Sequence, residues 1–128
     1  MRDLYSNIGS VLALVPAVKT VAGEGPAIDT HGFNRIAFVV NTGAIAGDGE
    51  FGLKVQESDT TTSGDFTDAD AAVVDANAPA TLTANGAFKL GYRGHKRYIR
   101  LALTKEGGTS IAAGAVAVLG DPANAPVA

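Results

Sequence analysis

Several segments of the chain alternate apolar and polar residues with a period of two, which is the pattern of a β-strand with one buried face. The clearest is residues 51–57, where every second side chain is large and apolar: Phe51, Leu53 and Val55. Residues 35–40 show the same alternation, and the Gly-Asp-Gly sequence at 47–49 is typical of a turn. We therefore expect a β-hairpin over residues 34–57.

A second hairpin is predicted over residues 98–119. Residues 98–104 and 111–119 are strand-like, and the segment between them contains Gly107 and Gly108, which readily adopt positive φ. Residues 111–119 are apolar on both faces, as in a strand that is covered on both sides. We expect this strand to be central in its sheet or to contact another subunit.

Shorter strand candidates recur about every 8 to 15 residues with turn residues between them; they cover residues 17–21, 27–29, 72–75, 80–83 and 87–92. With 128 residues, the chain fits one domain. The prediction is a single-domain, all-β sandwich or barrel. Residues 57–85 break this regularity and predict a long surface excursion, in which residues 67–74 are compatible with a short helix.

Both ends of the chain stand apart from these strands. Residues 1–15 precede the first good strand candidate, and residues 120–128 contain Pro122 and Pro126, which are unsuited to a central strand. We expect an N-terminal arm at 1–15 and a C-terminal arm at 120–128, each able to lie across a neighbour.

Composition points to assembly. Of the residues, 46% are hydrophobic but only 6% aromatic, with no Trp, so the core is thin and contacts between subunits would add useful burial. The net charge of −3 gives no attraction to nucleic acid or to an anionic membrane, and neither is expected as a partner. The apolar stretch 8–18 is about half a bilayer span, and a cleaved signal peptide is disfavoured there because Asp3 cancels Arg2.

The residues that could carry chemistry do not form a recognisable site. The chain has no Cys, and its two histidines, His31 and His95, each lie beside a glycine in a turn context. No serine lies in a nucleophile motif. We therefore expect no enzyme activity, no catalytic residue, no cofactor and no metal site. The acidic run does not have calcium-loop spacing, but calcium binding stays open for Asp59, Asp65, Asp68, Asp70 and Asp75.

One basic cluster stands out. Residues 93–100 hold four of the ten basic residues, namely Arg93, Lys96, Arg97 and Arg100, and Tyr92 and Tyr98 bracket them. The cluster could contact an acidic protein surface, or it could be a solvated turn in which Arg100 pairs with a carboxylate of a neighbouring strand. Both interpretations stay open, and the negative net charge favours a protein over a nucleic acid as partner.

The segments 91–100 and 117–127, together with 28–33, 38–43 and 56–59, resemble small structural proteins encoded in the head-gene modules of tailed bacteriophages. The resemblance spans most of the chain and carries no catalytic signature. It implies a head decoration, or cement, protein with a jelly-roll sandwich. Such a protein is made in the host cytoplasm and binds the major capsid protein on the outer surface of the virion head, commonly as a homotrimer.

On this hypothesis two sets of residues are candidate contacts. The basic turn would meet the capsid through Arg93, Lys96 and Arg97. Self-association would use Tyr98, Arg100, Val116, Val118, Pro122 and Pro126. Two other functions remain as alternatives. A tail-tube or head-to-tail connector protein would form rings, and a carbohydrate-binding sandwich would need aromatic platforms, which three tyrosines and no Trp supply poorly.

Overall fold

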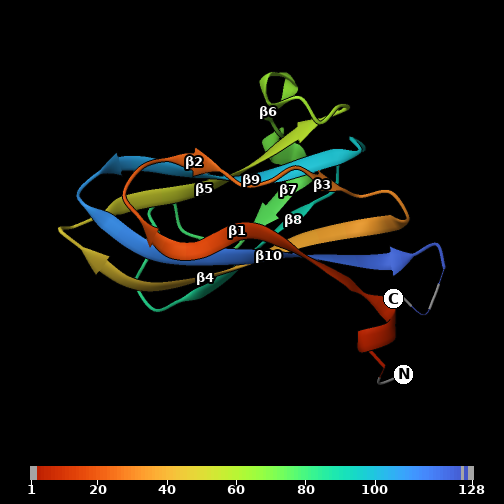
Figure 1. Ribbon diagram of the computed structural model, residues 1–128, viewed down its shortest axis with the longest axis horizontal. Coiled ribbons are helices and arrows are strands. Elements are labelled where there is room, and N and C mark those ends of the chain that lie inside the picture. Colours follow the sequence, from red (N-terminus) through yellow and green to blue (C-terminus); the bar gives the residue numbers. More distant parts are fainter. Residues whose placement is uncertain (1–2, 125, 127–128) are drawn as a thin grey trace.

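The computed structural model describes residues 3–124 and 126 and is an all-β sandwich, as the alternation predicts. Two antiparallel sheets lie one above the other (Figure 1). Sheet A has the order β1 (Gly9–Lys19), β10 (Ser110–Pro122), β4 (Phe33–Ala46), β8 (Ala87–Tyr92) and β7 (Val74–Ala76). Sheet B has the order β2 (Gly23–Glu24), β9 (Tyr98–Gly107), β5 (Glu50–Ser58) and β6 (Thr67–Asp68), and β3 (Ile28–Asp29) also pairs with β9.

The core lies between the two sheets and is built by the predicted alternation. On β4 and β10 every second side chain points inward, and the fully buried ones include Phe38, Val40, Ile111 and Leu119. Sheet B contributes a matching inner face, with Phe51, Ile99 and Leu101 fully buried. Only a few of these side chains are aromatic, which agrees with the thin core that the composition predicts.

The two predicted hairpins are wrong, although their strands are present. β4 lies in sheet A and β5 in sheet B, so the turn at 47–49 carries the chain from one sheet to the other. Likewise β9 lies in sheet B and β10 in sheet A. The glycines predicted to turn do so, with φ of 59° at Gly47 and 76° at Gly108. Alternation identifies the buried face of each strand, but it does not identify the neighbouring strand.

The arms are shorter than expected. β1 begins at Gly9 and pairs with β10 from Gly9 opposite Leu119 to Lys19 opposite Ile111, so residues 9–15 belong to sheet A. β10 continues to Pro122, which lies opposite Phe33 of β4. Proline is tolerated there because β1 does not extend past Leu119, so this end of β10 has a strand on one side only.

The middle of the chain is irregular, as predicted, but its details differ. No helix spans 67–74; the described residues there form β6, the single 3-10 turn η3 (Ala71–Val73) and the start of β7. Asp70 caps that turn by accepting from the Ala72 N–H at 2.9 Å. Residues 80–83 form no strand, yet Leu82 is buried and donates its N–H to Phe51 O. Two further 3-10 turns are η1 (Tyr5–Asn7) and η2 (Ser63–Asp65).

Two predictions of position are confirmed. The strand at 87–92 is β8, and the strand that is apolar on both faces, β10, is central in sheet A between β1 and β4. Over residues 3–124 and 126, the structure has no helix of the length and apolarity needed to cross a bilayer.

Candidate functional site

The basic turn links β8 to β9, and each of its three candidate capsid contacts is held by an aspartate. Arg93 Nε lies 2.7 Å from Asp75 Oδ2, and Lys96 Nζ lies 2.7 Å from Asp59 Oδ2. Arg97 binds both carboxylate oxygens of Asp29, at 2.9 and 2.8 Å. The three aspartates lie far from the turn in the sequence. The turn therefore ties β3 and the segment after β5 to the end of the sandwich.

These ion pairs set the charge state of the turn. The hydrogen bond from Arg97 lowers the pKa of Asp29 to about 2, and the hydrogen bond from Arg93 lowers the pKa of Asp75. The hydrogen bond to Asp59 raises the pKa of Lys96. Each pair joins a cationic side chain to a carboxylate, so the charges of the turn cancel in pairs. The sequence of the turn is strongly basic, but in the folded chain its surface, together with the paired aspartates, is nearly neutral.

Tyr92 sits beneath the turn. Its hydroxyl donates to Glu57 Oε1 at 2.5 Å and accepts the Lys96 N–H at 3.2 Å. Burial, followed by the hydrogen bond to Glu57, raises the pKa of Tyr92 to about 12. The phenol therefore stays protonated at any physiological pH and acts as a fixed brace of the turn.

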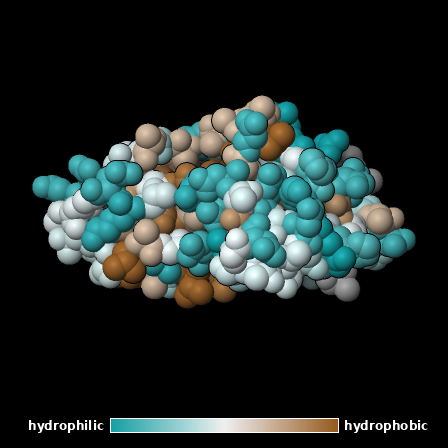
Figure 2. Space-filling model, turned by 90° about the horizontal axis from the view of Figure 1, so that it is seen from above, coloured by the Kyte–Doolittle hydropathy of each residue, from teal (hydrophilic) through white to brown (hydrophobic). Residues whose placement is uncertain are grey.

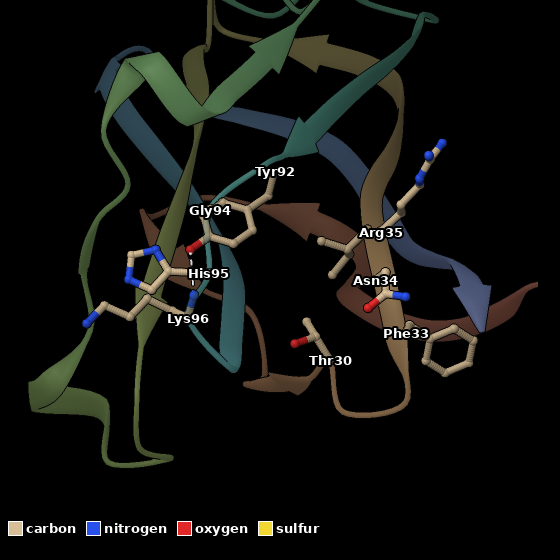
Figure 3. A pocket seen from close by; sticks show the side chains of 9 residues that line it. Thr30, Phe33, Asn34, Arg35, Tyr92, Gly94, His95 and Lys96 are labelled. Atoms are coloured by element: carbon tan, nitrogen blue, oxygen red, sulfur yellow. Dashed lines mark hydrogen bonds between the residues drawn. The ribbon is translucent and has the colours of Figure 1, made fainter. Parts of the chain in front are cut away.

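A polar pocket of about 220 Å³ opens beside the turn (Figure 3). Its charged groups diverge: Figure 3 shows Arg35 directed away on one side and His95 and Lys96 directed away on the other. His31 does not line it. Among the described residues no group of three or more His, Asp or Glu side chains could hold a metal ion. The pocket walls offer no converging set of charges for catalysis.

The acidic run of the middle segment is dispersed rather than gathered around one point. Asp59 and Asp75 pair with the turn, Asp68 accepts from Lys54 and Gln56, Asp65 accepts from Thr60, and Asp70 caps η3. Each carboxylate thus has a protein partner of its own, and these partners position the loop.

The candidate self-association residues fall into two groups. Arg100 is 7% exposed, and its guanidinium binds Gln56 Oε1 at 2.6 Å and Ser63 Oγ at 2.9 Å, all within one chain. Tyr98 is half-buried, with the Arg97 guanidinium 5.2 Å from its ring centroid. Both residues therefore stabilise sheet B of a single chain, and Arg100 leaves little surface for a second copy.

Three members of the other group, Val116, Val118 and Pro122, lie on β10, and Pro126 lies beyond the end of that strand. Val116 is 43% exposed, Val118 and Pro122 are half-buried, and Pro126 is exposed. Val116 lies opposite Leu12 on β1 and opposite Val39 on β4, which are 46% and 42% exposed. These three residues form an apolar row across three neighbouring strands. We use "outer face of sheet A" for this row and the residues beside it.

A hollow of about 490 Å³ lies on the outer face of sheet A, lined by Leu12, Pro16, Val39, Asn41, Gly114 and Val116. Gly114 lets Pro16 of β1 pack closely against β10 at one side of the hollow, because a Cβ at position 114 would lie 2.8 Å from Pro16 Cβ. The lining carries no charged side chain. By contrast, the view from the side of sheet B is mostly hydrophilic or neutral, with hydrophobic residues in small groups (Figure 2).

Only one strand of this face is expected from the sequence to be apolar on its outer side. The apolarity of residues 111–119 on both faces indicates Val116, whereas the sequence predicts an arm at Leu12 and a strand with one apolar face at Val39. The adjacent valines at 39 and 40 were the available signal, since neighbouring strand residues point to opposite faces.

Comparison with known proteins adds no functional assignment: no protein-family model and no curated protein matches the chain.

Proposed function

We propose that the chain is a non-enzymatic structural protein of a tailed-phage head, a decoration protein that binds the outer surface of the major capsid protein shell and stabilises it. It is made in the host cytoplasm and is located on the surface of the virion head. The resemblance of residues 91–100 and 117–127 to proteins of phage head-gene modules supports the phage setting. The geometry supports the broader class, a protein that works by surface contact.

The observation that carries this proposal is the apolar outer face of sheet A. Leu12, Val39 and Val116 are each more than two-fifths exposed and adjacent across three strands. A contiguous exposed apolar patch marks an interaction surface in soluble proteins, because leaving it in water is unfavourable. An assembly protein covers such a face when it meets its partners. We infer a homotrimer, in which the self-association residues include Val116, Val118, Pro122 and Pro126.

We also infer that the sandwich is a jelly roll. Sheet A has the order β1-β10-β4-β8-β7 and sheet B the order β2-β9-β5-β6, with β3 also paired with β9. The chain crosses between the sheets after β1, β3, β4, β6, β8 and β9. This alternation is the connectivity expected when two Greek keys are wrapped into one sandwich.

The capsid contact is assigned to the basic turn. The side chains of Arg93 and Arg97 are 59% and 52% exposed, so a capsid carboxylate can reach them without any unfolding. Each cation of the turn is already paired with an aspartate. A carboxylate of the capsid can therefore add binding affinity only if it shares the cation with that aspartate or replaces it. The turn would thus contribute specificity of position more than total affinity.

Co-sedimentation with empty heads of the encoding phage, prepared without this protein, tests the proposal. We expect saturable binding at a fixed ratio to the major capsid protein. The triple variant Arg93→Gln, Lys96→Gln, Arg97→Gln should bind about tenfold or more weakly. Its matched control is Asp29→Asn, Asp59→Asn, Asp75→Asn, which breaks the same ion pairs but keeps the cations.

The two variants separate a contact from a structural effect. If both lose binding equally, the ion pairs shape the turn and the cations are not contacts. If neither loses binding, the turn is not the capsid site. Absence of binding by the unaltered chain would overturn the decoration function itself.

A further inference from the structure

The N-terminal turn η1 leaves its own apolar side chains in water. Leu4 is 67% exposed and Tyr5 is 86% exposed, the latter the most exposed large hydrophobic side chain of the described residues. The turn is ordered all the same, because Asp3 Oδ1 accepts the Ser6 N–H at 3.0 Å and Asp3 O accepts from the Asn7 side chain. Figure 1 shows η1 outside the two layers of the sandwich. A preorganised apolar projection of this kind is suited to insertion into a partner.

The outer face of sheet A holds the matching concavity. Its hollow of about 490 Å³ is large enough for an aromatic side chain, and its rim at Val39 lies opposite Lys89 of β8. Lys89 is exposed and forms no ion pair with any residue in 3–124 or 126. An incoming Leu4-Tyr5 segment would bring Asp3, and with it the negative charge that complements Lys89.

The turn cannot reach the hollow of its own chain. Gly9 is fixed opposite Leu119, and Leu12 opposite Val116, in one continuous strand. Leu12 lies about 10 Å along the strand from Gly9, at a rise of about 3.3 Å per residue, and η1 lies beyond Gly9 at the outer end of the strand. The hollow of one copy is therefore open to the turn of another.

Two flat outer faces in contact would make a small interface. With strands about 4.8 Å apart and a rise of about 3.4 Å per residue, the face across the full lengths of β1, β10, β4 and β8 covers about 700 Å². A standard interface buries about 800 Å² on each partner. An inserted tyrosine and leucine add the buried anchor that the flat face lacks.

We propose that the N-terminal turn of one copy, through Leu4 and Tyr5, docks in the hollow lined by Leu12, Val39, Val116 and Gly114 of a second copy. The donor and acceptor surfaces differ, so the contact is heterologous and closes into a ring such as the trimer of the proposed function, on which this inference rests. The occupant is a second copy of this chain, and the capsid shell is left to the basic turn.

The absence of Cys in the chain allows a direct test. Two single-cysteine chains, one with Tyr5→Cys and one with Val39→Cys, are mixed under mild oxidation and resolved without reductant. We expect the mixed disulfide dimer to dominate. The matched control replaces Val39→Cys by Val21→Cys, an apolar position that is 69% exposed and does not line the hollow. Crosslinking of the control to the same extent, or Val39→Cys pairing mainly with itself through face-to-face sheets, overturns the proposal.

Sedimentation equilibrium of cysteine-free variants gives a second measurement. Tyr5→Ser and Val116→Ser should each weaken association at least tenfold, while Val21→Ser should not change it. If Val116→Ser weakens association and Tyr5→Ser does not, the hollow has a different occupant and the proposal is overturned. A monomeric unaltered chain would overturn it as well. Tyr5→Ser is also co-sedimented with empty heads. If Tyr5→Ser is monomeric but still binds the heads, the decoration function does not depend on this contact between copies. Failure of the inference can therefore be told apart from failure of the decoration function.

Discussion

The guanidinium of Arg100 lies 4.3 Å from the ring centroid of Phe66, and this contact joins sheet B to the irregular loop that follows β5. Phe66 is the one aromatic residue between positions 57 and 85, and it is buried. Arg100 also binds Gln56 on β5 and Ser63 in η2, so one side chain connects β9, β5 and the loop. The loop has few apolar residues of its own, and this polar and cation–π anchor replaces a hydrophobic one.

Replacing the anchor should destabilise the fold. Arg100→Met keeps much of the side-chain volume but leaves Gln56 Oε1 without its donor, and we expect the free energy of unfolding to fall by about 2–3 kcal/mol. Urea denaturation measures this loss. Arg35→Met is the control, because that side chain is 83% exposed and its nearest carboxylate is 3.9 Å away. An equal loss in the two variants would contradict the anchor role.

The ion pair between Asp29 and Arg97 of the basic turn should make the stability of the fold sensitive to acid. The pKa of Asp29 is lowered from 3.8 to about 2 in the folded chain, so the unfolded chain binds the proton more readily. The contribution of Asp29 to stability is thus present above pH 3.8 and is lost as the pH falls toward 2. We expect the Tm to fall over this range when it is followed by circular dichroism.

Asp29→Asn isolates that contribution. The variant should have a lower Tm than the unaltered chain at pH 7, and the difference should be much smaller at pH 2, since Asp29 of the folded unaltered chain is then about half protonated. Added salt should narrow the gap at pH 7, because the pair with Arg97 is about half exposed. A gap that is constant from pH 7 to pH 2 would assign the effect to something other than the ion pair.

The strands of the sandwich and their buried faces could be predicted from the local alternation of apolar and polar residues. Which strands pair with each other could not. Residues 51–57 and 98–104 show which side chains face inward, and the structure confirms this at Phe51, Leu101 and Leu103. Both turns were placed correctly at their glycines. Yet the same turn sequence can close a hairpin within one sheet or cross between two sheets. The choice depends on non-local partners, such as β10 filling the space between β1 and β4.

The candidate site shows the same limit. The charge cluster at 93–100 was visible as a run of basic residues, but its neutralising aspartates lie at positions 29, 59 and 75, too distant to assign from sequence. The outer face of sheet A combines three strands from the two ends and the middle of the chain. Two of these strands carry a local signal: β10 is apolar on both faces at Val116, and the adjacent valines 39 and 40 of β4 point to opposite faces.

Close packing between β1 and the chain after β2 predicts a strict requirement for glycine at position 25. A Cβ on Gly25 would lie 1.9 Å from Ala13 O and 3.2 Å from Leu101 O, and both are backbone atoms that cannot rotate away. We expect Gly25→Ala to cost about 3 kcal/mol by forcing the strands apart. Gly23→Ala is the control, since its Cβ would meet no described atom within 4 Å. Thermal unfolding of the two variants compares them, and a Tm for Gly25→Ala equal to that of Gly23→Ala would refute the packing argument.

The side chain of Thr42 holds the loop before β8 by hydrogen bonds. Its hydroxyl donates to Thr83 O at 2.6 Å and accepts the Gly86 N–H at 2.9 Å, at a position that is 8% exposed. Thr42→Val keeps the shape and removes both bonds, leaving buried backbone groups without this partner, and the expected cost is about 1–2 kcal/mol. Hydrogen exchange should also accelerate at the Gly86 amide. The exposed Thr81→Val serves as control, with a change within about 0.5 kcal/mol. Unchanged exchange at Gly86 in Thr42→Val would show that the amide is protected by burial alone.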